Sequence, residues 1–135
     1  MATVLCVATI TATSALAQSA SGNAGWDAIR QGHAEEAAAA FADALRDQPR
    51  DPSLHLGAAL AAQLLGDRAH ARESLEQALK LAPNFTTASL LLGDLLYRQS
   101  DLQSAIAVYE AARKTKDHGQ ALRAVTDWLA KATLE

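Results

Sequence analysis

The sequence has very little cysteine and few aromatic residues. Cys6 is the single cysteine among 135 residues, and aromatic residues make up 4% of the chain. A lone thiol excludes an intramolecular disulfide framework. Half of the residues are hydrophobic, but alanine and leucine dominate them, and no stretch alternates apolar and polar residues over the length of a strand. The chain is therefore expected to be all-α and to be stabilised by packing alone.

The sequence also lacks a surplus of positive charge. Lys and Arg number 12 against 15 Asp and Glu, which gives a formal net charge of −3. Both signs are interspersed, so no basic stripe could track a phosphate backbone. Nucleic acid is therefore excluded as the expected partner.

Motifs that carry chemistry are missing as well. The sequence has no Cys-x-x-Cys pair, no glycine-rich phosphate loop and no Gly-x-Ser-x-Gly turn. The four histidines are not paired at helical spacing, and we interpret them as surface side chains: His33, His55, His70 and His118. We expect no catalytic residues, no metal site and no cofactor, and hence not an enzyme.

The first 17 residues differ from the rest of the chain. They carry no charged side chain, begin with an apolar run and end in a small-residue Ala15-Leu16-Ala17 sequence. This pattern predicts a signal peptide cleaved after Ala17, although no Lys or Arg follows Met1. An exported, periplasmic protein is expected, and the alternative is a loosely docked N-terminal tail. Cys6 would be removed with this segment.

Three segments of the chain repeat one pattern at intervals of 34 residues. The aligned columns are a turn residue (Gly32, Gly66, Ser100), two alanine positions (Ala37, Ala71, Ala105 and Ala44, Ala78, Ala112), a large residue between them (Phe41, Leu75, Tyr109), a small residue before the turn (Gly25, Ala59, Gly93) and a closing position (Pro49, Pro83, Asp117). The alanines and the large residue recur on one helical face. The pattern predicts pairs of helices that approach closely at the alanines, with the large side chain filling the space between them.

The same columns predict where the helices turn and end. A glycine supplies the backbone freedom that a sharp reversal between helices needs. Proline ends a second helix, and Asp51-Pro52 can begin the next with an N-cap and a proline in the first turn. Gly22 and Gly25 weaken the leading helix, which we expect to be short or frayed.

The 34-residue period, the alanine and large-residue columns and the closing proline resemble the tetratricopeptide repeat. The resemblance implies an α-solenoid of three units over residues 18–51, 52–85 and 86–119. Residues 120–135 are expected to form a capping helix with an apolar stripe of Ala121, Leu122, Val125, Leu129 and Ala132. The third unit departs from the pattern by having Ser100 for glycine and Asp117 for proline.

The resemblance implies that the first helix of each unit lines a concave groove in which a peptide or helix binds. The residues that would face this groove are Trp26, Ile29, Arg30, Leu56, Leu60, Gln63, Leu90, Asp94, Tyr97 and Arg98. The opposite faces would form the core with Leu54, Ala58, Ala61, Leu65, Ala88, Leu92, Leu95 and Leu96. The leucines of the groove set have two interpretations. They pack against neighbouring first helices, or they form an apolar floor that receives a partner.

The expected function is a non-catalytic scaffold that binds a partner protein or peptide. One alternative is the N-terminal docking region of a longer exported enzyme, such as a metallopeptidase, in which the chemistry lies elsewhere. A second alternative is self-association through the frayed first helix.

Overall fold

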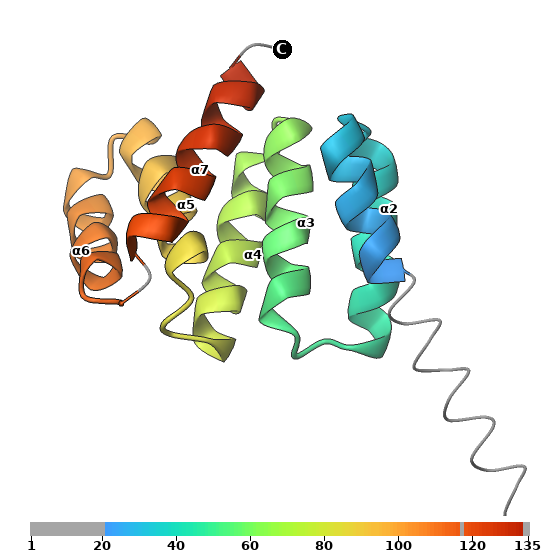
Figure 1. Ribbon diagram of the computed structural model, residues 1–135, viewed down its shortest axis with the longest axis horizontal. Coiled ribbons are helices and arrows are strands. Elements are labelled where there is room, and N and C mark those ends of the chain that lie inside the picture. Colours follow the sequence, from blue (N-terminus) through green and yellow to red (C-terminus); the bar gives the residue numbers. More distant parts are fainter. Residues whose placement is uncertain (1–20, 117, 134–135) are drawn as a thin grey trace, which may run out of the picture.

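The computed structural model describes residues 21–116 and 118–133, and every regular element within them is a helix. A helix over residues 21–31 is followed by α2 (Ala34–Asp47), α3 (Pro52–Leu64), α4 (Arg68–Leu81), α5 (Thr86–Arg98), α6 (Leu102–Arg113) and α7 (His118–Thr133). Successive helices pack as antiparallel pairs along one array (Figure 1). The expected signal peptide, residues 1–17, lies outside the described residues.

Aspartates begin three of the helices. The Asp51 carboxylate accepts a hydrogen bond from the Ser53 backbone N–H at 2.9 Å, in front of Pro52 at the first turn of α3. Asp67 caps α4 through the His70 N–H at 3.1 Å, and Asp101 caps α6 through the Ser104 N–H at 3.3 Å. Each cap satisfies a backbone donor that has no partner within the helix, which fixes the boundary.

The reversals within the three units have the same backbone geometry. Gly32, Gly66 and Ser100 adopt φ values of 77°, 79° and 64°, in the left-handed region. The residue after each then donates its N–H to a carbonyl five positions back, at 2.9, 2.9 and 3.0 Å. This is a Schellman-type helix end. The third unit therefore keeps the turn even though a serine occupies the glycine position.

The repeated alanines lie at the contacts between helices, as the columns predicted. Ala37, Ala71 and Ala105 are buried, and so are the alanines seven positions after each of them. Phe41 and Leu75, between the alanines of the first two units, are completely enclosed. Close approach at the alanines and a bulky side chain between them thus build one continuous core.

Glycines of the first and second units pack against Phe41; the small-residue column predicted close approach at Gly25, whereas Gly57 was not predicted. Residues 21–31 are continuously helical, so within that range the expected fraying is absent. A Cβ at Gly25 would lie 2.8 Å from the Phe41 ring, and a Cβ at Gly57 would lie 2.3 Å from it. Both glycines therefore leave room for Phe41, which contacts the first helix of its own unit and α3 of the next.

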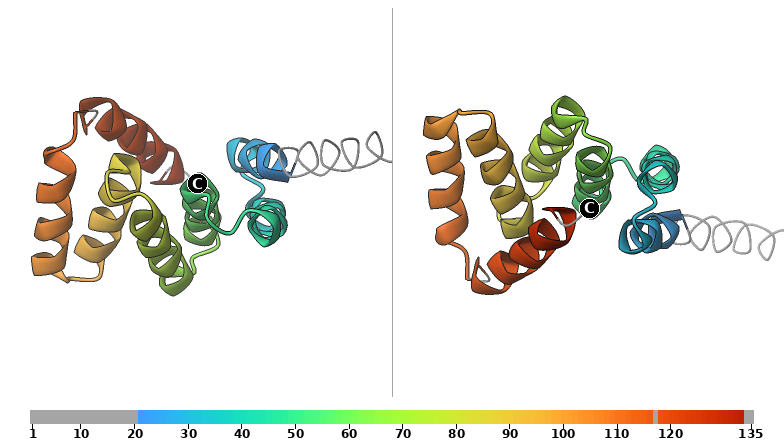
Figure 2. Two further views of the ribbon diagram at one scale, coloured as in Figure 1. Left: turned by 90° about the horizontal axis from the view of Figure 1, so that it is seen from below. Right: turned by 90° about the horizontal axis from the view of Figure 1, so that it is seen from above.

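The C-terminal helix packs against α5 and runs across it toward α3 (Figures 1 and 2). Ala121 and Val125, on the inner side of this helix, are buried, as expected for a capping helix. Leu122, however, is 50% exposed, so its place in the predicted apolar stripe is wrong. It follows Ala121 directly and therefore points about 100° away around the helix. The side chains of Leu129 and Ala132 lie outside the described residues.

One predicted core residue is also wrong. Leu65 is 48% exposed, whereas Leu54, Ala61, Ala88, Leu92, Leu95 and Leu96 are buried and Ala58 is partly buried. Leu65 is the C-cap residue of α3, directly before the reversal at Gly66. Its side chain lines a hollow at the surface instead of the interior.

Candidate functional site

The candidate groove residues lie on one row of helices. Residues 21–31, α3 and α5 form this row, while α2 and α4 lie on its other side (Figure 2). The positions are equivalent from unit to unit at the 34-residue interval: Trp26, Leu60 and Asp94 share one position, and Ile29, Gln63 and Tyr97 share another. The sequence prediction therefore selected residues at corresponding places along the array.

The apolar members of this set are mostly enclosed. Ile29, Leu56, Leu60 and Leu90 are buried and belong to the core cluster. Trp26 is partly buried and contacts Phe41 edge-on, with ring centroids 5.1 Å apart. Their burial favours the interpretation in which these leucines pack against neighbouring helices, and it leaves little of them for a partner to contact.

The accessible part of the face lies at the last turn of α5. Tyr97 is 62% exposed, and Arg98 pairs with Asp94 on the preceding turn, with Nε and Oδ2 3.0 Å apart. Arg30, also exposed, pairs with Asp27 one turn back in its own helix. An aromatic surface thus lies beside an ion pair, a combination that suits contact with another protein.

Tyr109 of α6 lies close to this turn. Its ring packs over Gly93, where a Cβ would come within 2.7 Å of Cε1. Burial raises the pKa of the Tyr109 phenol from 10.0, the Asp94 carboxylate raises it further, and the Arg98 guanidinium acts in the opposite direction. Sequence reasoning placed Tyr109 only in the core column, although the structure brings it next to the candidate site.

Two polar atoms of the candidate face lack a hydrogen-bond partner. Within the described residues, Gln63 Oε1 and Asp94 Oδ2 are buried side-chain acceptors to which no hydrogen bond is made. The 3.0 Å separation of Asp94 Oδ2 from Arg98 Nε makes an ion pair without hydrogen-bond alignment. Buried acceptors are normally satisfied, so these two are exceptions, and their burial keeps a partner from contacting them directly.

The hollow lined by Leu65, which the sequence did not predict, opens between α2, α3 and α4. Its volume is about 370 Å³, and the residues that line it are Ala38, Ala42, Leu45, Ala58, Ala62, Leu65, Asp67 and His70. The signal in the sequence is Ala38, whose equivalents in the later units are the larger Arg72 and Ile106. The small side chain leaves space beside the first unit.

No group of His, Cys, Asp and Glu side chains among the described residues is arranged to hold a metal ion. None of the helices among these residues is long and apolar enough to cross a membrane.

The sequence model of the family described as "Tetratricopeptide repeat" matches residues 23–67 and 58–121. No curated protein matches the chain.

Solved structures share its fold. The first tetratricopeptide repeat domain of Spaghetti (RPAP3), bound to the HSP90 peptide SRMEEVD, has a TM-score of 0.68 at 22% identity, over 84% of this chain and 93% of that one. The Sgt2 domain from Aspergillus fumigatus has a TM-score of 0.69 at 19% identity, over 87% and 82% of the two chains. The first domain of human RPAP3 has a TM-score of 0.67 at 21% identity, over 87% and 96%.

Proposed function

Since the chain belongs to the tetratricopeptide repeat family, we propose that it is a non-catalytic scaffold that binds a peptide or helix of another protein. The binding face consists of residues 21–31, α3 and α5. One observation carries the proposal. At the last turn of α5, exposed Tyr97 lies beside the Asp94–Arg98 ion pair, whose guanidinium is also exposed.

The chemistry of this face defines what it would bind. A partner would place an apolar or aromatic side chain against the Tyr97 ring, where burial of area is favourable. It would also place an acidic or hydrogen-bond-accepting group near the exposed Arg98 guanidinium. The buried leucines beneath would hold the helices in place and would contact the partner only at their edges.

Related structures support a binding role of this general kind. The Spaghetti (RPAP3) domain is bound to an HSP90 peptide. At 22% identity that likeness concerns the fold, so the specificity proposed here rests on the residues of this chain.

Site-specific photo-crosslinking in the native cell tests the proposal. A photoreactive amino acid replaces Tyr97 in one variant and Gln77, an exposed residue of α4, in the control. Position 97 should yield a discrete crosslinked protein that mass spectrometry identifies, and position 77 should not. Equal yields of the same product from both positions, or no product from position 97, would refute the proposed face.

A second test uses the partner so identified. The double variant Tyr97→Ala, Arg98→Glu should weaken binding at least about tenfold, since it removes an aromatic contact and reverses a charge. Both side chains are exposed, so helicity measured by circular dichroism should stay unchanged. Leu81→Ala on α4 is the control, because it removes an exposed leucine away from this face. Unaltered affinity in the double variant would place the contact elsewhere.

A further inference from the structure

The outer face of α6 carries an apolar stripe that none of the described elements covers. Leu102 is 52% exposed and Ile106 is 57% exposed, and Tyr109 follows at 36%. Their spacing of four and three residues places them on one face of the helix. Clusters of large apolar side chains are uncommon on the exposed surface of a monomer. Where they occur, they mark sites of contact with another molecule.

The repeat register shows which way this stripe faces. Ile106 and Arg113 of α6 correspond to Ala38 and Leu45 of α2, at twice the 34-residue interval. In α2 these positions face the next unit, because they line the hollow shared with α3 and α4. The stripe on α6 therefore faces the direction in which another helical unit would follow.

The following helix does not occupy that direction. Among the described residues, α7 packs against α5 and makes no comparable contact with α6. Figure 2 shows α6 at one end of the array, with α7 running back over α5. The outer face of α6 is thus left open.

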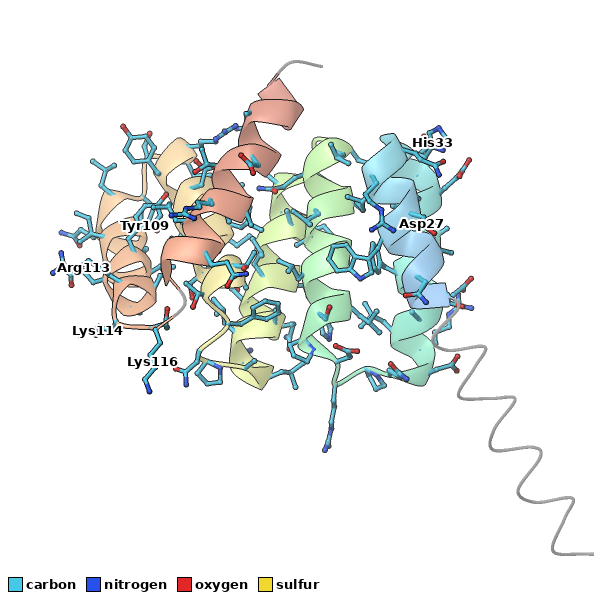
Figure 3. The ribbon with its side chains drawn as sticks, in the orientation of Figure 1. Asp27, His33, Tyr109, Arg113, Lys114 and Lys116 are labelled. Atoms are coloured by element: carbon cyan, nitrogen blue, oxygen red, sulfur yellow. The ribbon has the colours of Figure 1, made fainter. Side chains whose placement is uncertain are left out.

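Charge is distributed unevenly along this face. Asp101 caps the N-terminal end of α6, while Arg113, Lys114 and Lys116 lie at or just beyond its C-terminal end. Figure 3 shows these three basic residues gathered at that end of the array. Glu110, one turn earlier, is the remaining charged residue of the helix. The α6 face is therefore acidic at its start and basic at its end.

We propose that this face binds a second copy of the same chain, with the two α6 helices antiparallel about a twofold axis. Ile106 would then pack against Tyr109 of the partner subunit, and the aliphatic stem of Arg113 would cover Leu102 of the partner subunit. Asp101 would lie beside Lys114 of the partner subunit, so opposite charges and opposite helix ends meet at both edges. A parallel pair would instead place all the basic residues together.

The first unit, at the opposite end of the array, has a charged surface that would not pack well against the apolar stripe of α6. The first unit carries the ion pairs Arg30–Asp27 and Arg46–Asp43 on its surface, together with a contact between His33 and Glu36. Asp27 and His33 lie at that end in Figure 3, and none of the exposed large hydrophobic residues belongs to it among the described residues. Head-to-tail stacking would therefore cover apolar side chains with charged ones. The tail-to-tail arrangement buries apolar area on both copies and closes as a dimer.

The proposed interface is small. The 12 residues of α6 span about 18 Å, so the contact lies at the low end of specific interface sizes. The dimer should accordingly be weak, with a dissociation constant of roughly 10–100 μM.

Sedimentation equilibrium measures this association directly. The weight-average mass of the full chain should rise from near the monomer value of 14.2 kDa at low concentration toward twice that value at high concentration. Ile106→Glu should keep the protein monomeric throughout, and the exposed pair change Arg113→Glu, Lys114→Glu should weaken association about tenfold. Leu81→Glu, an exposed leucine on α4, is the matched control and should associate like the wild type.

The result that overturns the proposal is a monomer at every concentration, or equal association of Ile106→Glu and wild type. Circular dichroism checks that each variant keeps its helices. If Ile106→Glu loses helicity, the Arg113→Glu, Lys114→Glu variant decides the question. Neither outcome affects the photo-crosslinking test of the Tyr97 face, so the two proposals fail separately.

Disulfide trapping tests the antiparallel register. In a Cys6→Ser background, a chain with Leu102→Cys is mixed with a chain with Arg113→Cys. The mixed disulfide should form several times faster than either homodisulfide, because these positions face each other only in the antiparallel pair. Faster formation of the two homodisulfides would overturn the proposed arrangement.

Discussion

The first and third units share one backbone plan but differ in what covers it. Phe41 and Tyr109 occupy the same position, each packed over a glycine of its own unit's first helix. Phe41 is also enclosed by Gly57 of the following unit and is fully buried, whereas Tyr109 stays 36% exposed. The burial of this side chain therefore depends on the unit that follows, and the two ends of the array are left with different surfaces.

Removing the large residue from each unit should show the greatest difference. Phe41→Ala is expected to cost about 3–5 kcal/mol of unfolding free energy, because it leaves a cavity within a closed core. Tyr109→Ala should cost about 1–2 kcal/mol, because solvent reaches part of the site already. Urea unfolding followed by circular dichroism measures both. Equal losses would mean that the third unit is as tightly packed as the first.

Substitution of the glycines that pack against these rings tests the same comparison between the units. A Cβ at Gly57 would lie 2.3 Å from the enclosed Phe41 ring, so Gly57→Ala should destabilise by about 1–3 kcal/mol. At Gly93 the Cβ would lie 2.7 Å from the Tyr109 ring, which can swing toward solvent. Gly93→Ala should then be close to neutral, since alanine favours the helix by about 0.5–1 kcal/mol. A larger loss from Gly93→Ala in urea unfolding would contradict this view of Tyr109.

The turns between the two helices of each unit differ at one position, which is glycine in two units and Ser100 in the third. Substitutions there should change stability by a smaller amount. Ser100 holds a φ of 64° that glycine adopts without strain, so Ser100→Gly should stabilise by about 0.5–1 kcal/mol. Gly66→Ala, at a φ of 79°, should destabilise by about 1 kcal/mol. Thermal unfolding of the two variants should shift the midpoint in opposite directions. A fall in the midpoint for Ser100→Gly would show that the serine side chain contributes more than its backbone costs.

The regular part of the fold could be predicted from the sequence because the same steric demand recurs in each unit. The alanine columns, the turn positions and the Asp51 cap each follow from local geometry repeated at 34 residues. Leu65 and Leu122 were misplaced because their exposure depends on the end of a helix and on the docking of α7. A helix end and the docking of α7 each act at a single place in the array, so the repeated pattern does not contain them.

The candidate site was harder to predict for a related reason. Equivalent positions identified the face, but burial divides it into enclosed leucines and an accessible turn around Tyr97. That division depends on how neighbouring units and α7 cover each helix. The unpartnered acceptors of Gln63 and Asp94 and the proximity of Tyr109 to Asp94 likewise depend on how helices pack in three dimensions, which no periodicity within the sequence reveals.

Alkaline pH should produce the smallest difference in stability between the first and third units, through ionisation of Tyr109. Burial raises the pKa of its phenol above the ordinary 10.0, so the folded state favours the neutral form. The neutral Tyr109 phenol contributes its full share to the free energy of unfolding below pH 10. This contribution is lost as the pH rises through the folded-state pKa, because the phenol loses its proton more readily in the unfolded chain. Tyr109→Phe removes this dependence, whereas the first unit has a phenylalanine at that position already. Ultraviolet difference absorbance should detect one tyrosine that ionises late in the wild type and not in the variant. If the wild type and Tyr109→Phe lose stability identically above pH 10, the phenol is as solvated as in the unfolded chain, and the third unit is more open than its packing over Gly93 indicates.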